Sequence, residues 1–91
     1  MQPQGTKFFT GYLSAETLQL SLSDNVIAIT IKVTTGTVEV TGSAQLKGVA
    51  SVAIALSSGD TITLTGTDAN SPIDSLFIDA TSGACNLITQ Q

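Results

Sequence analysis

The stretch VIAITIKVTTGTVEVTG, residues 26–42, decides the fold class of this chain. Its apolar side chains alternate with polar or small ones, and they are Ile27, Ile29, Ile31 and Val33, followed by Val38 and Val40. An alternation with a period of two is typical of a β-strand with one buried face. The stretch therefore predicts β-structure with a well-defined inner side.

We predict that this stretch is a β-hairpin with Thr35 and Gly36 at the centre of its turn. Glycine readily takes the positive φ that tight hairpin turns require. In this register the apolar residues of the two arms face each other, and Lys32 faces Glu39. A slip of one residue would break every one of these pairings, so the register is well specified.

The rest of the chain contains further strand-like segments, at residues 7–13, 17–22, 50–56, 60–66, 73–80 and 84–89. Turns with a glycine at residues 57–59 and 81–83 are expected to fold the neighbouring segments into two more hairpins. Together with the arms of the first hairpin, the chain has about eight short strands and no long helical periodicity. We therefore predict an all-β fold, an antiparallel β-sandwich or a jelly-roll-like fold, with a small barrel as a variant.

A length of 91 residues corresponds to one domain. Met1 to Thr6 is polar and carries Pro3 and Gly5, so residues 1–6 are expected to form a flexible N-terminal arm. Residues 7–91 are expected to form the β-domain. The N-terminal residues lack the pattern of a signal peptide, which predicts synthesis in a cytoplasm.

Charge is sparse in this chain. Charged residues make up 11% of the sequence, against roughly 25% in an ordinary soluble domain. A net charge of −4 without any Arg or His argues against binding to nucleic acid or to an anionic membrane. Because charge usually protects exposed sheet edges, its scarcity favours a homo-oligomer. The alternative is a β-sandwich with a Thr-rich surface.

The sequence contains no pattern of catalytic or metal-binding residues. His is absent, and Cys85 is the single cysteine, which we expect to be buried. Asp68, Asn70 and Asp74 lie across one loop, where they fit an ordinary polar turn better than a calcium site. We predict no enzymatic activity, no cofactor and no metal.

Three of the four aromatic residues, Phe8, Phe9 and Tyr12, lie in one short segment. Phe8 and Phe9 are adjacent, so on a strand they point to opposite faces. Either the rest of the fold covers both faces, or one of them contacts another subunit, since aromatic residues are enriched in interface cores. Phe77 lies in a segment that is apolar on both sides. The candidate interface residues are therefore Phe8, Phe9, Tyr12 and Phe77.

The segment DTITLTGTDANSPIDSLFIDATSGACNLI, residues 60–88, resembles small structural proteins of tailed bacteriophage particles. The resemblance implies a non-enzymatic virion protein, made in the host cytoplasm. Such a protein acts as a capsid decoration, or cement, protein bound to the major capsid protein. It further implies a homo-oligomer, with a trimer favoured, and a role for the N-terminal arm in gripping the shell. Two alternatives stay open: a carbohydrate-binding or adhesion module of a tail or fibre, and a tail-tube or filament subunit.

Overall fold

The structure, a computed structural model, describes residues 8–43, 48–66 and 72–91. These residues form seven strands and one short 3-10 helix, η1 (Leu22–Asp24). The strands are β1 (Phe8–Ser14), β2 (Thr17–Ser21), β3 (Ala28–Gly42), β4 (Ile54–Ser57), β5 (Thr61–Thr65), β6 (Ser75–Asp79) and β7 (Gly83–Gln90). All strand pairs are antiparallel, so the prediction of an all-β antiparallel fold is confirmed. The N-terminal arm expected at residues 1–6 lies outside the described residues.

The hairpin predicted for residues 26–42 is wrong, because β3 is one strand of 15 residues that runs through Thr35 and Gly36. Its register against β7 shifts between Val33 and Thr35, which marks a β-bulge. A bulge adds one residue and bends the strand sharply. The buried side chains of β3 have odd residue numbers up to Val33 and even numbers from Val38 on, the same change that a hairpin turn would produce. The predicted facing of Lys32 and Glu39 is therefore also wrong, since both lie along the same strand.

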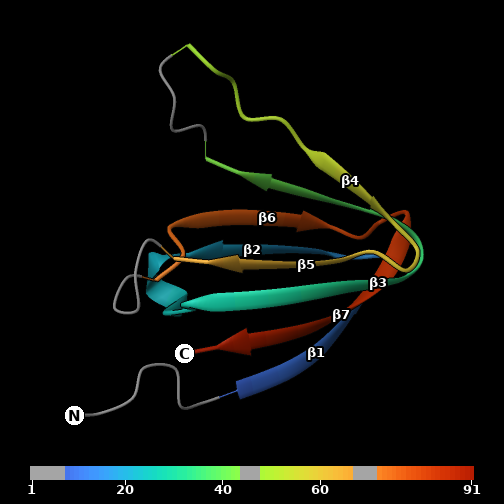
Figure 1. Cartoon of the computed structure of the whole chain (residues 1–91), viewed down its shortest axis with the longest axis horizontal. Helices are drawn as coiled ribbons and strands as arrows, with labels where there is room; N and C mark the ends of the chain where they lie inside the picture. Colours follow the sequence, from blue (N-terminus) through green and yellow to red (C-terminus); the bar gives the residue numbers. More distant parts are fainter. Residues whose placement is uncertain (1–7, 44–47, 67–71) are drawn as a thin grey trace.

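The other strands end or begin at the place where β3 bends. β4 and β5 follow each other along one side of β3, and β6 and β7 follow each other along the other side. β1 and β2 run beside β7 and β6 in the same manner. The sheet therefore consists of four chain segments that all cross one bend, which lies at the right of Figure 1.

The two additional hairpins predicted around residues 57–59 and 81–83 are also wrong. Both segments are corners, where the chain passes from one half of the sheet to the other. At the first corner, the Gly59 amide donates a 2.9 Å hydrogen bond to the Val33 carbonyl, and the Val33 amide donates one of 2.9 Å to Asp60. Gly59 has a φ of 95°, which a residue with a Cβ rarely adopts. These bonds hold the first corner to β3, and at the second corner the Thr37 amide of β3 donates a 3.3 Å hydrogen bond to the Ser82 carbonyl.

The bend creates two halves that share β3. One half has the strand order β1-β7-β3-β5, and the other has the order β2-β6-β3-β4. The observed architecture is one curled sheet, and the predicted sandwich or jelly-roll topology is not confirmed. The described ranges contain seven strands instead of the predicted eight or so, chiefly because the two arms of the expected hairpin are a single strand.

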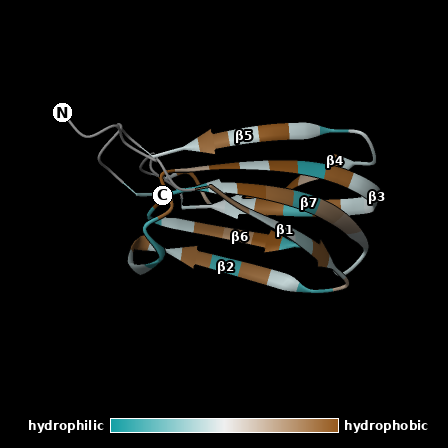
Figure 2. Ribbon diagram, turned by 90° about the horizontal axis from the view of Figure 1, so that it is seen from below, coloured by the Kyte–Doolittle hydropathy of each residue, from teal (hydrophilic) through white to brown (hydrophobic). Residues whose placement is uncertain are grey.

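The core lies between the two halves and consists of the inward residues of the strands. Its largest fully buried side chains are Ile29, Ile31, Val33, Val38, Ile78 and Cys85. Figure 2 shows the alternation of apolar and polar residues along the strands that produces this inner layer. Among the described residues, no polar or charged side chain is buried in it. The cohesion of the fold therefore rests on apolar burial and on the backbone ladder.

Candidate functional site

The most exposed aromatic side chains of the described residues lie on β1. Phe8 is 65% exposed, Tyr12 is 62% exposed and Phe9 is 48% exposed. Neither Phe8 nor Phe9 enters the core, so the described part of the fold does not cover both of them. Within the described part of the chain β1 pairs only with β7, which places β1 at the margin of the sheet (Figure 1).

The outward face of β1 carries Phe8, Thr10 and Tyr12, which alternate along the strand. Their partners across the ladder on β7 are Gln90, Ile88 and Asn86, respectively. Ile88 is 48% exposed, so it extends the aromatic surface onto the neighbouring strand. A shallow hollow lies over this pair of strands, lined by Thr10, Gly11, Tyr12, Asn86, Leu87 and Ile88. We name the outward residues Phe8, Tyr12 and Ile88 the aromatic edge surface.

The inward face of β1 carries Phe9, Gly11 and Leu13. Leu13 is buried in the core, whereas Phe9 remains half-exposed near the start of the strand. A Cβ built on Gly11 meets no heavy atom within 4 Å, so there is open space above this residue. The inward face of β1 is therefore covered only at its C-terminal end.

Phe77 is separate from these residues. It lies on β6 in the other half of the sheet, between Gln19 of β2 and Thr41 of β3. Its side chain is half-buried and faces outward, because its neighbours Leu76 and Ile78 face the core. The structure thus brings Phe8 and Tyr12 to one surface, places Phe9 on the opposite face of the same strand, and does not bring Phe77 to them.

A pair of carboxylates that the sequence did not suggest lies on the outer face near the bend. Glu39 of β3 and Asp79 of β6 are direct partners in the ladder. A hollow next to them is lined by Thr37, Glu39, Asp79, Thr81 and Ser82. The Thr81 hydroxyl donates a 2.6 Å hydrogen bond to Asp79, and the Thr81 amide donates one of 3.0 Å.

These hydrogen bonds from Thr81, the hydroxyl first and the amide second, lower the pKa of Asp79 below its usual value. A carboxyl that serves as a general acid near neutral pH has a raised pKa instead. Asp79 is therefore an ionised hydrogen-bond acceptor whose bonds with Thr81 stabilise the corner at residues 80–82. Burial raises the pKa of the Cys85 thiol, which keeps this side chain in its unreactive thiol form.

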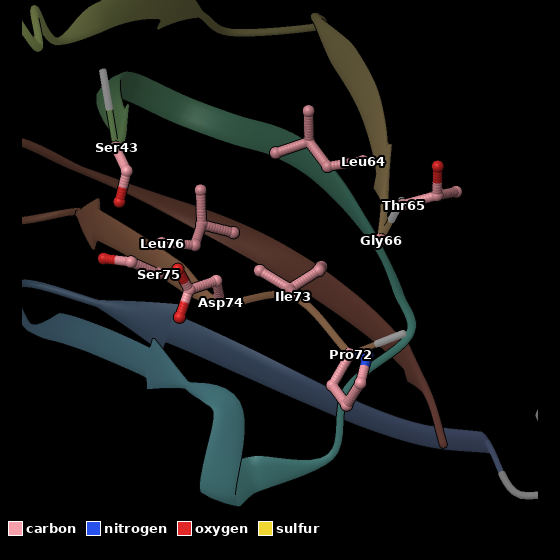
Figure 3. A pocket seen from close by; sticks show the side chains of 9 residues that line it. All are labelled: Ser43, Leu64, Thr65, Gly66, Pro72, Ile73, Asp74, Ser75 and Leu76. Atoms are coloured by element: carbon pink, nitrogen blue, oxygen red, sulfur yellow. The ribbon is translucent and has the colours of Figure 1, made fainter. Parts of the chain in front are cut away.

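A third hollow opens on the core between β5 and β6, at the end of the sheet that lies away from the bend. Its apolar lining comes from Leu64, Ile73 and Leu76, with Ser43, Asp74 and Ser75 at its polar side (Figure 3). Its volume is about 220 Å³. Leu56, Ile62 and Leu64 of the neighbouring edge are only half-buried. This edge of the core is therefore only partly covered.

The described residues contain no group of three or more His, Cys, Asp or Glu side chains that could hold a metal ion. Asp68 and Asn70, which the sequence placed in a polar turn, lie outside the described residues. No helix in the described part of the chain is long and apolar enough to cross a membrane. No protein-family model matches the chain, and no curated protein matches it.

Proposed function

We propose that this chain is a non-enzymatic virion structural protein that decorates a capsid by binding the lattice of the major capsid protein. The observation that supports the proposal is the aromatic edge surface on β1. Two large aromatic side chains, each more than 60% exposed, stand beside the exposed Ile88 on a strand that carries no charge. Aromatic residues are the side chains that most often supply the binding energy of protein interfaces.

The way in which such a protein would act follows from its surface. Exposed aromatic rings lose contact with water when a second protein covers them, and each contributes apolar area without a charge that must be desolvated. A decoration protein that bridges neighbouring capsid subunits adds this buried area to the shell and so opposes its rupture. The resemblance of residues 60–88 to phage structural proteins supports this specific setting.

The test is co-sedimentation of the purified protein with shells assembled from the major capsid protein of the phage whose genome encodes the chain. We expect saturable binding to the shells and a higher temperature of shell rupture. A Tyr12→Ala variant should bind at least about tenfold more weakly, as for an interface aromatic that contributes about 1.4 kcal/mol or more. A Phe77→Ala variant is the matched control, because Phe77 lies on the other half of the sheet. Absence of binding to shells would overturn the proposal.

A second function is favoured by one specific observation, the position of Asn86 beside Tyr12. The two residues are ladder partners, both are exposed, and both line the shallow hollow on this face. An aromatic ring next to an amide suits a sugar, since the ring packs on its apolar face and the amide bonds its hydroxyl groups. Titration with a panel of glycans separates this function from decoration. Saturable glycan binding that is lost in Asn86→Ala would favour the carbohydrate-binding module.

The third alternative, a tail-tube or filament subunit, differs from the first two in assembling without a shell. Electron microscopy of the purified protein distinguishes it. Regular filaments would favour the tail-tube function, and discrete particles would favour decoration or carbohydrate binding.

A further inference from the structure

We propose that two copies of this chain pair through their β1 strands, antiparallel and about a two-fold axis at Thr10, so that one sheet continues across the dimer. The inference does not rest on the capsid function proposed above. It rests on the edge of β1 that no other strand of the described residues pairs with, on the order of its side chains and on the open space above Gly11.

The edge of β1 has the properties of a strand that accepts another strand. It is seven residues long without interruption, and none of its residues is charged or proline. Natural proteins usually protect a free edge with charges, proline or a bulge, because the unpaired backbone groups otherwise pair with another chain. Two copies of β1 can therefore approach without charge repulsion between the strands.

The opposite margin of the sheet is less suitable. It consists of β4 and β5, with four and five residues, which are separated by the corner at residues 58–60. Asp60 lies at this corner, where its carboxylate accepts a hydrogen bond of 2.8 Å from the Ser57 amide. A pairing between two such edges would be short and interrupted, so β1 is the better edge.

Symmetry restricts the register of the pairing. A two-fold axis perpendicular to the sheet keeps each side chain on its own face. Two residues that lie opposite each other across the dimer must then be on the same face of β1, so they are separated along the chain by an even number of positions. One residue at the centre therefore lies opposite its own copy, and the axis passes between these two copies. Near the middle of β1, this central residue can be Phe9, Thr10 or Gly11.

The register centred on Thr10 fits the side chains best. On the outward face, Phe8 lies opposite Tyr12 of the second copy, and aromatic pairs across strands are stabilising. On the inward face, Phe9 lies opposite Gly11 of the second copy, where no heavy atom occupies the space within 4 Å of a Cβ position. An aromatic side chain placed across from a strand glycine covers the backbone that the glycine exposes.

The two neighbouring registers lose these matches. With the axis at Phe9, Phe8 faces Thr10 of the second copy and Gly11 has no aromatic partner. With the axis at Gly11, Phe8 faces Ser14 and Phe9 faces Leu13, whose side chain is already buried in its own core. Only the Thr10 register gives every aromatic residue of β1 an aromatic or a glycine as its partner.

The experiment measures the mass in solution by light scattering over a dilution series, together with two lysine variants. The wild-type protein is expected to have twice the mass of the 9.3 kDa chain. Thr10→Lys places two like charges against each other at the axis, and it should weaken the dimer at least about tenfold. Thr65→Lys, at an exposed position on the β5 edge, is the matched control and should leave the dimer intact. Unchanged circular dichroism shows that each variant is folded.

Cysteine variants then test the register. Thr10→Cys should form a disulfide with itself under mild oxidation, while Thr65→Cys should not; the native Cys85 is buried and does not compete. A mixture of Phe8→Cys and Tyr12→Cys should cross-link to each other faster than either does to itself. A monomer at the highest concentration, a trimer, or equal cross-linking at Thr65→Cys would overturn the proposal. A dimer that binds no capsid shell would leave this inference standing and refute the proposed function.

Discussion

Gly36 and Gly83 lie directly opposite each other where β3 and β7 cross the bend. Neither position has room for a side chain. A Cβ on Gly36 would collide with backbone atoms of Ser82 and Gly83, and a Cβ on Gly83 would collide with backbone atoms of Thr35 and Thr37. The close approach of these two backbones at the bend therefore requires glycine at both positions.

Gly83→Ala is therefore expected to destabilise the fold substantially. The atoms that its Cβ would meet belong to the backbone of β3, which cannot move aside without breaking the ladder at the bend. Overpacking of this kind costs about 1–3 kcal/mol or more. The free energy of unfolding, measured with urea, should fall by at least about 1 kcal/mol.

The matched control for this variant is Gly42→Ala. Gly42 also lies in a strand at this sheet, but a Cβ there would be 3.9 Å from the Ser75 carbonyl oxygen, an ordinary contact. Its replacement should change stability by less than about 1 kcal/mol, since alanine loses less backbone entropy than glycine on folding. Equal losses in the two variants would contradict the steric role of the glycine pair.

The sequence predicted which faces of β3 are buried, but not its topology. Ile29, Ile31, Val33, Val38 and Val40 are all buried, as their alternation indicated. The change of phase between Val33 and Val38 is compatible with a turn or with a bulge, and the alternation alone does not distinguish the two. A glycine with positive φ serves equally well in both, and Gly36 has a φ of 65°. The same ambiguity explains the two corners that were predicted as hairpins.

The candidate interface residues on β1 were predicted from the local concentration of aromatic residues, and not from a sequence motif. The clustering of aromatic residues in one short segment pointed to Phe8, Phe9 and Tyr12, and all three are exposed. Their contact with another molecule stays a prediction. The pair of Glu39 and Asp79 could not be foreseen, because it depends on which strands are neighbours in the sheet. Residue spacing along the chain carries no information about that pairing.

Glu39→Lys is expected to stabilise the protein. In the wild-type protein Glu39 lies directly opposite Asp79, and like charges in that position are destabilising. A lysine would face the carboxylate with the opposite charge, and we expect a gain of about 0.2–1 kcal/mol in the free energy of unfolding. The gain should shrink at high salt, which screens exposed charges.

Asp74→Lys provides the control for this variant, because it changes the net charge by the same amount at another exposed position. If both variants stabilise the protein equally, the effect comes from the net charge. The local pairing of Glu39 with Asp79 would then have no measurable consequence.

Asp79→Ala should destabilise the protein in a manner that depends on pH. The hydrogen bonds from Thr81 lower the pKa of Asp79 in the folded state below the 3.8 of an unperturbed aspartate. Because the pKa is lowered in the folded state, the ionised Asp79 carboxylate stabilises the fold fully above pH 3.8. This stabilisation is lost as the pH falls through the pKa of Asp79 in the folded state. The difference in Tm between wild type and Asp79→Ala should therefore be constant at neutral pH, and it should shrink as the pH falls below 3.8.

Asp79→Asn distinguishes the charge from the hydrogen bonds. The amide oxygen can still accept from Thr81, but it does not titrate, so any difference between the alanine and asparagine variants should be independent of pH. A difference between wild type and Asp79→Ala that stays constant down to pH 2 would show that the ionised carboxylate contributes nothing to the corner.

Phe9→Ser and Leu13→Ser should differ sharply although both residues lie on the inward face of β1. Phe9 is 48% exposed, so its replacement should cost about 1 kcal/mol or less and should leave a folded chain. Leu13 is 8% exposed and belongs to the core, so its replacement should cost about 2–5 kcal/mol through the cavity and the buried hydroxyl. Urea unfolding measures both losses, at protein concentrations low enough to keep the protein monomeric.

If Phe9→Ser unfolds the chain, Phe9 belongs to the core and its assignment to an interface is wrong. If it leaves a stable fold and lowers self-association, the exposed ring serves contacts with another molecule, since a ring that supported only its own subunit would be needed for folding.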